Sequence, residues 1–546
     1  MSRLDKVLIF SLGFAFLLCL YGLNWGGSHS WHPDEMAFQT IFRPGELPFN
    51  PKWFHKPPFH TYFNFFLSTL PFFIIGKIIP IDPEYINFIQ VIKVFWSRLL
   101  TVFLFLGSII LVYKITERFF GIFAARCVAL VFATSAGLIA FSHFLTTDIP
   151  VTFWMLLAFY FAQNILFGGS QRDYILAGLL TGIATATKYN GLAIGIAIVV
   201  AHVLSHRHFA WQKLIFSRQL YLGLAAVTLG FIAGNPFAIL DYPTFISHFM
   251  YNYIVTPVYD GSTGNSYIKF WLCFVEIIGW PSFLLFSLGF GFCFYFLLTG
   301  AKYRQEKKAL ILLLSVFFLY YYKFGSFPRI ETRFVLPILP YWMILSGPFW
   351  RLLKPTRIFP ISLAVILSYN GICGFYVGKR FTEDPRMAAL EWVKQNIPPD
   401  SYIESTRYSP DWNDKPGVNL KVTRIPHQIA IRDKIFESRL QQNPWVWPIL
   451  EKDIDRSHIA EQWFTVEALQ ERNSDYIALN SLYYNRFFTD AGEKYYPYIR
   501  DYFQNLLAGK LGYKIGFDAD SQPVPQWIYP QHIDSLDNRM TILARE

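Results

Sequence analysis

The stretch TYFNFFLSTLPFFIIGKIIPI, residues 61–81, decides how the rest of the chain is threaded through a membrane. It is apolar enough to cross a bilayer, yet Pro71 stands in its middle and Lys77 near its end. If it crosses, the later basic clusters land outside, against the rule that Lys and Arg stay on the cytoplasmic side. These clusters are KITER (114–118), HRHFAWQK (206–213), AKYRQEKK (301–308) and KPTR (354–357). We therefore expect residues 61–81 to form an interfacial helix, which a proline and a charge suit better than a clean span.

The composition of the whole chain indicates a membrane protein. Of 546 residues, 53% are hydrophobic and 16% charged, with a mean hydropathy of +0.29, more apolar material than a soluble fold of this length buries. The net charge of +10 does not predict a nucleic-acid partner, because most Lys and Arg residues fall in the expected cytoplasmic loops. All five cysteines lie inside apolar runs, so we expect core residues, without disulfides or a thiolate metal site.

Besides residues 61–81, eleven runs are able to cross about 30 Å of hydrocarbon, which takes about 20 residues. They lie near 5–25, 88–113, 122–143, 149–168, 173–187, 190–205, 219–238, 270–299, 308–324, 333–350 and 358–377. The first is expected to be a retained helix with its N-terminus inside. The two runs flanking Lys188 are short, which indicates tilted or broken helices. We predict an all-α polytopic membrane module over residues 1–378, with about eleven transmembrane helices and interfacial helices in the first outer loop.

From residue 379 onward the apolar runs stop, and residues 379–546 are expected to form an extracytoplasmic α/β domain. Residues 384–396 have helical spacing, with Asp384 as the cap and Pro385 at the first helical position. SYIES (401–405), SDYIALN (474–480), YKIGFD (513–518) and MTILAR (540–545) read as strands, and YYPYIRDYFQNLLAG (495–509) as a second helix.

Under this topology, charged residues of both signs gather on the face opposite the basic loops. A charge at membrane depth is costly unless it is paired or lines a wet cavity, so such residues are functional candidates. Lys188 and Arg333 can neutralise a phosphate, and Asp34 can accept the proton of an attacking hydroxyl. A phosphate leaving group is a weak base, so no general acid is obligatory. The gathered residues are Asp34, Glu35, Lys56, Arg98, Asp148, Lys188, Arg329, Glu331 and Arg333.

Six stretches, in order, resemble the GT-C membrane glycosyltransferases of the protein O-mannosyltransferase and aminoarabinose lipid A transferase type. They are HPDE (32–35), NPKWFHKPPF (50–59), SRLLTVFLFLGSIILVYKITERFFG (97–121), SHFLTTDIPVTFW (142–154), AGLLTGIATATKYNGL (177–192) and ETRFVLPILP (331–340). The resemblance implies a polyprenyl-phosphate-linked sugar donor, an inverting single displacement with Asp34 as the base, and a donor pocket near the outer surface. His55 stands where the aminoarabinose transferases commonly have an acidic residue, so that branch's substrate and metal are not carried over.

With this resemblance, we predict a catalytic role for Asp34 and Glu35, donor-phosphate binding by a second group, and supporting contacts to substrate by a third. The phosphate group is Lys188, Arg333, Tyr189 and Arg98, and the supporting group is Lys56, His55, His143, Asp148 and Glu331. The reaction needs no cofactor, and a divalent metal is left open. His55, His60 and Asp148 are the residues a metal would take, but no third ligand stands at a diagnostic spacing, so no metal site is predicted.

Structural roles compete with several of these assignments. Asp34 and Glu35 could cap an interfacial helix, and Asp148 could cap the fourth span. Lys188 could pair with Asp148 instead of phosphate, as Arg333 could with Glu331 or lipid headgroups. Other structural alternatives are an interfacial Lys56, an Arg98 that anchors a helix end, and a His143 with its hydrogen bonds satisfied.

Three other functions compete with the transferase. A lipid-linked sugar flippase would place its charges near the bilayer midplane within inverted repeats. A block oligosaccharide transferase or ligase would differ only in donor size, and a receptor would leave the charges of the first outer loop unexplained. The acceptor, whether protein, lipid or polysaccharide, and the sugar stay open. We expect a bacterial inner membrane, because we find no convincing N-x-S/T site on the outer face.

Overall fold

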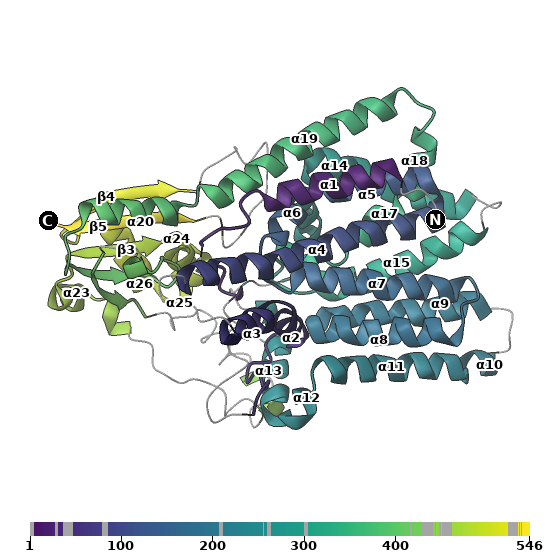
Figure 1. Ribbon diagram of the computed structural model, residues 1–546, viewed down its shortest axis with the longest axis horizontal. Helices are drawn as coiled ribbons and strands as arrows, with labels where there is room; N and C mark the ends of the chain where they lie inside the picture. Colours follow the sequence, from purple (N-terminus) through teal and green to yellow (C-terminus); the bar gives the residue numbers. More distant parts are fainter. Residues whose placement is uncertain are drawn as a thin grey trace.

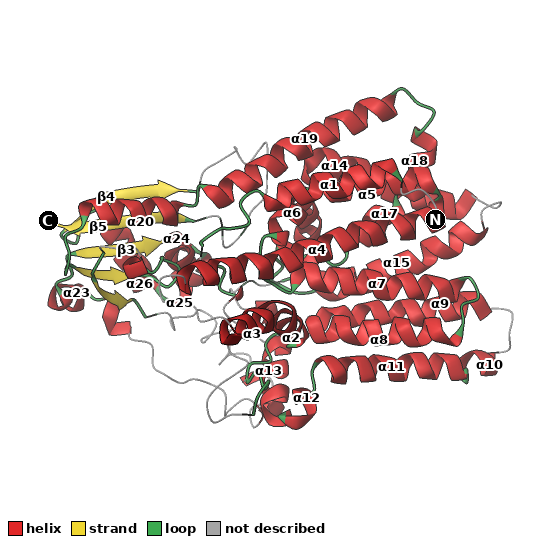
Figure 2. Cartoon of the chain, in the orientation of Figure 1, coloured by secondary structure: helices red, strands yellow, loops and turns green. Residues whose placement is uncertain are grey.

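The protein is a bundle of long helices with a small mixed sheet beyond one end (Figures 1 and 2). This computed structural model describes residues 5–27, 31–35, 47–78, 86–206, 211–254, 256–258, 262, 264–299, 304–414, 418–426, 441–442, 444–446, 449, 461–521, 533, 536 and 538–546. The bundle consists of α1 (Lys6–Leu20), α4 (Ile86–Phe120), α5 (Ile122–Thr134), α6 (Ala136–Ser142), α7 (Asp148–Leu166), α8 (Gln171–Thr187), η4 (Tyr189–Gly195), α9 (Ile196–His206), α10 (Trp211–Ile215), α11 (Arg218–Gly234), α14 (Tyr267–Thr299), α15 (Arg304–Gly325), α16 (Thr332–Val335), α17 (Leu339–Leu345), α18 (Gly347–Leu353) and α19 (Ile358–Thr382).

Among the described residues, six helices are long and apolar enough to cross a membrane, or seven if the bent pair α5 and α6 is one span. The chain is therefore a multi-pass membrane protein, while the count of eleven spans stays a prediction. Two predicted spans, α1 and α11, have 15 and 17 helical residues, and the predicted span 333–350 is broken into α16, α17 and α18. The shorter or broken apolar helices are too short to be counted among these six, although in Figure 1 they lie alongside the longer ones.

Residues 61–81 do not form one of the long spans. The segment is divided into α2 (Phe59–Asn64), a π-helical turn η2 (Phe65–Thr69) and α3 (Leu70–Ile78). Figure 1 shows α2 and α3 near α12 (Phe237–Leu240) and α13 (Tyr242–Ile254), at the end of the bundle that faces the sheet. The N-terminus, α10 and α18, which adjoin basic clusters, lie at the other end. These basic clusters thus lie at the end of the bundle that is away from the sheet and from residues 61–78.

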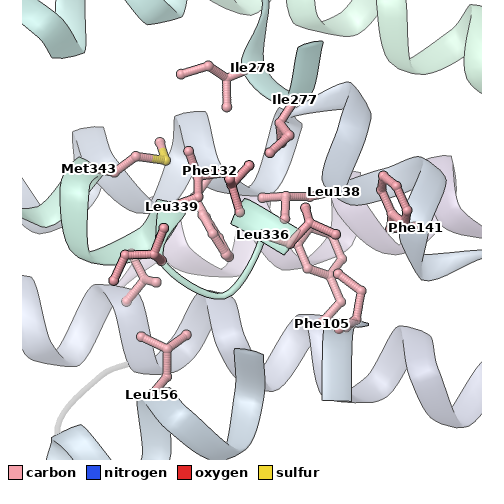
Figure 3. Packing of buried hydrophobic residues seen from close by; sticks show 14 of the residues in the cluster. Phe105, Phe132, Leu138, Phe141, Leu156, Ile277, Ile278, Leu336, Leu339 and Met343 are labelled. Carbon is pink, nitrogen blue, oxygen red and sulfur yellow. The ribbon is translucent and has the colours of Figure 1, made fainter. Parts of the chain in front are cut away.

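The core of the bundle joins segments that are far apart in the sequence (Figure 3). Phe105 of α4, Phe132 of α5 and Leu156 of α7 are fully buried against Leu336 and Leu339 near the start of the last broken segment. In lipid, close packing rather than water exclusion holds helices together, and small residues permit it. A Cβ at Gly178 or Gly182 of α8 would collide with the backbone of α11, so glycine at these positions permits the close approach of the two helices.

The C-terminal part forms a five-stranded sheet in the order β2-β1-β3-β5-β4. β1 (Tyr402–Ser405) pairs in parallel with β2 (Lys421–Arg424) and β3 (Tyr476–Asn480), whereas β5 (Arg539–Arg545) is antiparallel to β3 and β4 (Tyr513–Asp520). Around the sheet lie α20 (Pro385–Asn396), α23 (Val466–Arg472), α24 (Ser481–Tyr484), α25 (Asp490–Tyr495) and α26 (Pro497–Leu507). The four predicted strands and both predicted helices are present. β2 was missed because its four residues lack an apolar alternation.

The boundary proposed at residue 379 falls within α19, which continues to Thr382 before the chain turns into α20. The Asp384 side chain accepts a hydrogen bond from the backbone N–H of Arg386 at 2.9 Å, so the predicted N-cap is present. The helical part and the sheet are therefore joined by two helices in close succession.

Candidate active site

The predicted base lies in a tight turn directly after the buried Trp31. The backbone N–H of Asp34 donates to Nδ1 of His32 at 3.1 Å, and the N–H of Glu35 donates to the carbonyl of His32 at 3.0 Å. Burial lowers the pKa of His32, which suits a neutral ring that accepts through Nδ1. His32 therefore fixes the backbone at Asp34, a role that sequence reasoning missed although the residue belongs to HPDE.

The Asp34 carboxylate binds two cations from distant parts of the chain. Oδ2 lies 2.5 Å from Nζ of Lys56 and 2.9 Å from Nη1 of Arg333. Burial raises the pKa of Asp34, but the charges of Lys56 and Arg333 outweigh burial and hold this pKa well below its ordinary value. The three side chains are 21 to 27% exposed, so the group is within reach of a ligand.

Arg333 lies within the short helix α16, directly after Glu331 and Thr332. Its Nε donates to Glu331 at 2.5 Å, and Arg329 pairs with the same carboxylate. The segment is fixed by Thr332, which donates to Glu276 of α14, and by Tyr320, whose hydroxyl donates to the carbonyl of Phe334 at 2.5 Å. We refer to Asp34, Lys56, Glu331 and Arg333 as the site cluster.

A second ion pair stands beside the site cluster. Lys188 stands at the break between α8 and η4, and Asp148 is the first residue of α7. Nζ of Lys188 lies 2.5 Å from Oδ1 of Asp148. The structural alternative for Lys188 is thus present in the structure. The Lys188 ammonium lies 5.5 Å from the ring centre of Phe334, and the guanidinium carbons of Arg329 and Arg333 both lie at 5.7 Å from it. Three cations therefore gather around one aromatic ring.

Tyr189 and His55, predicted to contact donor or substrate, both hold the first outer loop. The Tyr189 hydroxyl donates to the carbonyl of Phe54 at 2.7 Å. The backbone carbonyl of His55 accepts a hydrogen bond from the Asn252 side chain at 2.6 Å. The ring centres of His55 and His248 lie 4.3 Å apart. Both residues hold the loop that carries Lys56 against α13 and η4.

Glu35 and Arg98, for which catalytic and phosphate-binding roles were predicted, form a fully buried pair with each other. Nη2 of Arg98 lies 2.9 Å from Oε2 of Glu35, and the two side chains are 0% and 1% exposed. Arg98 also donates to the carbonyls of Leu23 and Trp25, and Glu35 accepts from the N–H of Leu145 at 2.8 Å. With their hydrogen bonds made inside the protein, these groups position the turn that carries Asp34.

The predicted histidines are also internal. His143, for which a contact with substrate was predicted, is fully buried, with Nδ1 2.8 Å from the carbonyl of Ile139 and Nε2 3.0 Å from that of Tyr21. His60 is buried against Asn64, and burial lowers its pKa to about 3. Among the described residues, no three His, Cys, Asp or Glu side chains are grouped so as to hold a metal ion.

Glu276 and Phe334 contribute to the site and were not predicted. Glu276 is a carboxylate within the apolar run 270–299, and a charge inside a span is itself a signal of function. It lies three residues before Gly279, where α14 is interrupted by a φ of +73°. Phe334 gave no signal, because an aromatic residue in an apolar segment is ordinarily packing.

Comparisons with known proteins bear on the fold of the chain. Residues 90–235, roughly a quarter of the chain, match the sequence pattern of the family described as dolichyl-phosphate-mannose-protein mannosyltransferase. The solved structure of ArnT from Cupriavidus metallidurans without ligand has a TM-score of 0.51 at 15% identity, over 98% of this chain and 97% of that chain. The chain has the GT-C glycosyltransferase fold. The structure of ArnT bound to undecaprenyl phosphate also has a TM-score of 0.51, at 13% identity over 80% of this chain and 90% of that chain.

No curated protein matches this chain. The resemblance to GT-C glycosyltransferases drawn from the six stretches is confirmed. The matched segment holds Asp148 and Lys188 but not Asp34, Lys56 or Arg333. The pairing of Asp34 with Lys56 and Arg333 is thus a feature of the tertiary structure, outside the segment that matches the family.

Proposed function

We propose that this GT-C protein is an inverting glycosyltransferase that moves a sugar from a polyprenyl-phosphate carrier to an acceptor hydroxyl on the extracytoplasmic face. The observation that carries the proposal is the ion pairing of Asp34 with Lys56 and Arg333, beside Lys188, at the end of the bundle remote from the basic loops. Cations at a membrane surface suit an anionic donor, and a carboxylate among them suits proton removal.

The donor phosphate is proposed to take over the cations that now hold Asp34. Arginine binds phosphate oxygens in a bidentate way, and a phosphate offers more negative charge than one carboxylate. Once Arg333 faces the phosphate, its charge stabilises ionised Asp34 less, and the pKa of Asp34 rises. Donor binding would thus activate the base at the moment it is needed.

In the reaction, the acceptor oxygen attacks the anomeric carbon of the sugar and its proton passes to Asp34. The bond from that carbon to the phosphate oxygen breaks, and the polyprenyl phosphate leaves with the electron pair. A single attack from the opposite side inverts the anomeric centre. Arg333 and Lys188 stabilise the charge that grows on the phosphate, an electrostatic contribution that needs no general acid.

The reaction is proposed for the outer side of a bacterial inner membrane, with the sheet domain on that side. The support is the charge asymmetry, because the N-terminus, α10 and α18 adjoin basic clusters and lie away from the sheet. The solved structure of ArnT has undecaprenyl phosphate bound, and a carrier of this class is proposed here.

The test is sugar release from a panel of radiolabelled polyprenyl-phosphate monosaccharides by the purified protein in lipid. One donor should be turned over, and Asp34→Asn should lower turnover by a factor of roughly 100 or more, as expected for loss of a general base. Asp241→Asn is the matched control, since Asp241 also pairs with a lysine, Lys52, at 2.8 Å.

Equal turnover by Asp34→Asn and wild type would exclude Asp34 as the base. Movement of labelled lipid across the bilayer without consumption of any donor would establish the flippase instead. A larger oligosaccharide consumed in place of monosaccharides would establish block transfer.

A further inference from the structure

A second buried ion pair lies where the helical bundle meets the sheet domain. Asp384 and Arg386, at the start of α20, are both 0% exposed, and Nη2 of Arg386 lies 2.6 Å from Oδ2 of Asp384. Asn538, next to β5, donates to the same carboxylate oxygen at 3.4 Å. Burying two charges is costly and often adds no stability, so a buried pair invites the question of what it specifies.

Arg386 and Asp384 contact Trp25 and Trp31, the two tryptophans that precede the turn that carries Asp34. The guanidinium carbon of Arg386 lies 5.0 Å from the ring centre of Trp25 and 4.6 Å from that of Trp31. Nε1 of Trp25 donates to Oδ2 of Asp384 at 2.9 Å, and the two indoles meet edge to face at 5.7 Å. A buried arginine between aromatic rings is a directional contact that lysine does not reproduce.

The same two tryptophans connect this pair to the pair of Arg98 and Glu35. Arg98 lies 5.4 Å from the ring centre of Trp25 and donates to its carbonyl at 2.5 Å. Trp31 is three residues before Asp34, and Glu35 directly follows Asp34. The turn that carries Asp34 is therefore held on one side by the membrane bundle and on the other by the sheet domain.

We propose that Arg386 is a positioning residue, through which the sheet domain holds Trp31 and thereby keeps Asp34 opposite Lys56 and Arg333. This inference rests on the proposed function for its catalytic consequence, although the mechanical link is independent of it. The sheet domain then helps to position the active-site residues. Misplacement of a catalytic group by about 1 Å can cost on the order of 100-fold in rate.

The test compares Arg386→Lys with Arg472→Lys in the full-length protein. Arg472 is a matched control, because it pairs at 2.9 Å with Glu404, which is 0% exposed, and stacks at 4.1 Å on Trp463. Hydrogen exchange of the peptide containing residues 31–35 should accelerate roughly tenfold in Arg386→Lys and stay unchanged in Arg472→Lys. With the donor identified above, Arg386→Lys should lower kcat by about 10- to 100-fold with little change in the donor KM.

A second variant covers the case in which Arg386→Lys does not fold. Trp25→Phe keeps an aromatic ring but removes the hydrogen bond to Asp384, so exchange at 31–35 should rise in the same direction by a smaller factor. Unchanged exchange at 31–35 in a folded variant, or equal changes with Arg472→Lys, would overturn the proposal. If wild type turns over no donor while the exchange difference is present, the proposed function fails and the positioning link stands.

Discussion

Arg333 and Asp34 stand 299 positions apart in the sequence, yet Nη1 of one donates to Oδ2 of the other at 2.9 Å. The proposed base is thus held by a cation before any donor arrives. Its pKa lies below the ordinary value for this reason, because burial alone acts the other way. The first prediction concerns the pH at which this carboxylate takes up a proton.

Arg333→Gln and Lys56→Gln should move the acid limb of kcat/KM to higher pH. Each removes a positive charge that stabilises ionised Asp34, so the pKa of Asp34 rises, by roughly one pH unit or more. In wild type no acid limb is expected above pH 3.8, since the pKa of Asp34 is held below that ordinary value. Rates with the same donor, from pH 8 down to the lowest pH at which each protein stays folded, provide the measurement, and coincident acid limbs in all three proteins would contradict the prediction.

Lys188→Met should raise the donor KM by roughly 10- to 100-fold. A hydrogen bond to a charged group contributes about 1.5–3 kcal/mol, and the lost partner here is the proposed phosphate contact. Lys52→Met removes a lysine that is likewise paired with an aspartate and should leave KM unchanged. The comparison requires initial rates over a range of donor concentrations. Equal KM values for Lys188→Met and wild type would show that Lys188 serves Asp148 alone.

Arg98→Met should destabilise the protein by about 3–5 kcal/mol, because it leaves the carboxylate of Glu35 buried without its cation. The double variant Glu35→Gln/Arg98→Met should recover part of this loss, since no unpaired charge remains. Thermal unfolding in detergent, followed as Tm for the single and double variants, measures the coupling. Strictly additive Tm changes would be inconsistent with a coupled pair.

Gly279→Ala should destabilise α14, whereas Gly291→Ala in the same helix should stabilise it slightly. Gly279 has a φ of +73°, and a Cβ there would collide with the ring of Tyr369, so strain of about 1–3 kcal/mol is expected. At Gly291 a Cβ meets nothing within 4 Å, and Ala is better in a helix by about 0.5–1 kcal/mol. Opposite Tm shifts are expected, and a shift of the same sign in both would contradict this account.

Much of the fold could be predicted because its signals are local. The Asp384 cap, the four strands after residue 400 and the interruption at Lys188 each follow from a few neighbouring residues. β2 and the break of 333–350 into three short helices could not, because short elements are set by the partners they pack against.

For the active site, the sequence by itself determined which residue types gather at one end of the bundle: Asp34, Lys56, Asp148, Lys188 and Arg333 are all there. The tertiary structure alone decided which of the charged residues stay partly exposed and which are buried in pairs. Glu35 stands next to Asp34 but is turned into a buried pair with Arg98, while Arg333 arrives from 299 positions away. Hydropathy and spacing report how deep a residue lies, whereas the direction of its side chain depends on contacts between distant segments, which no local pattern encodes.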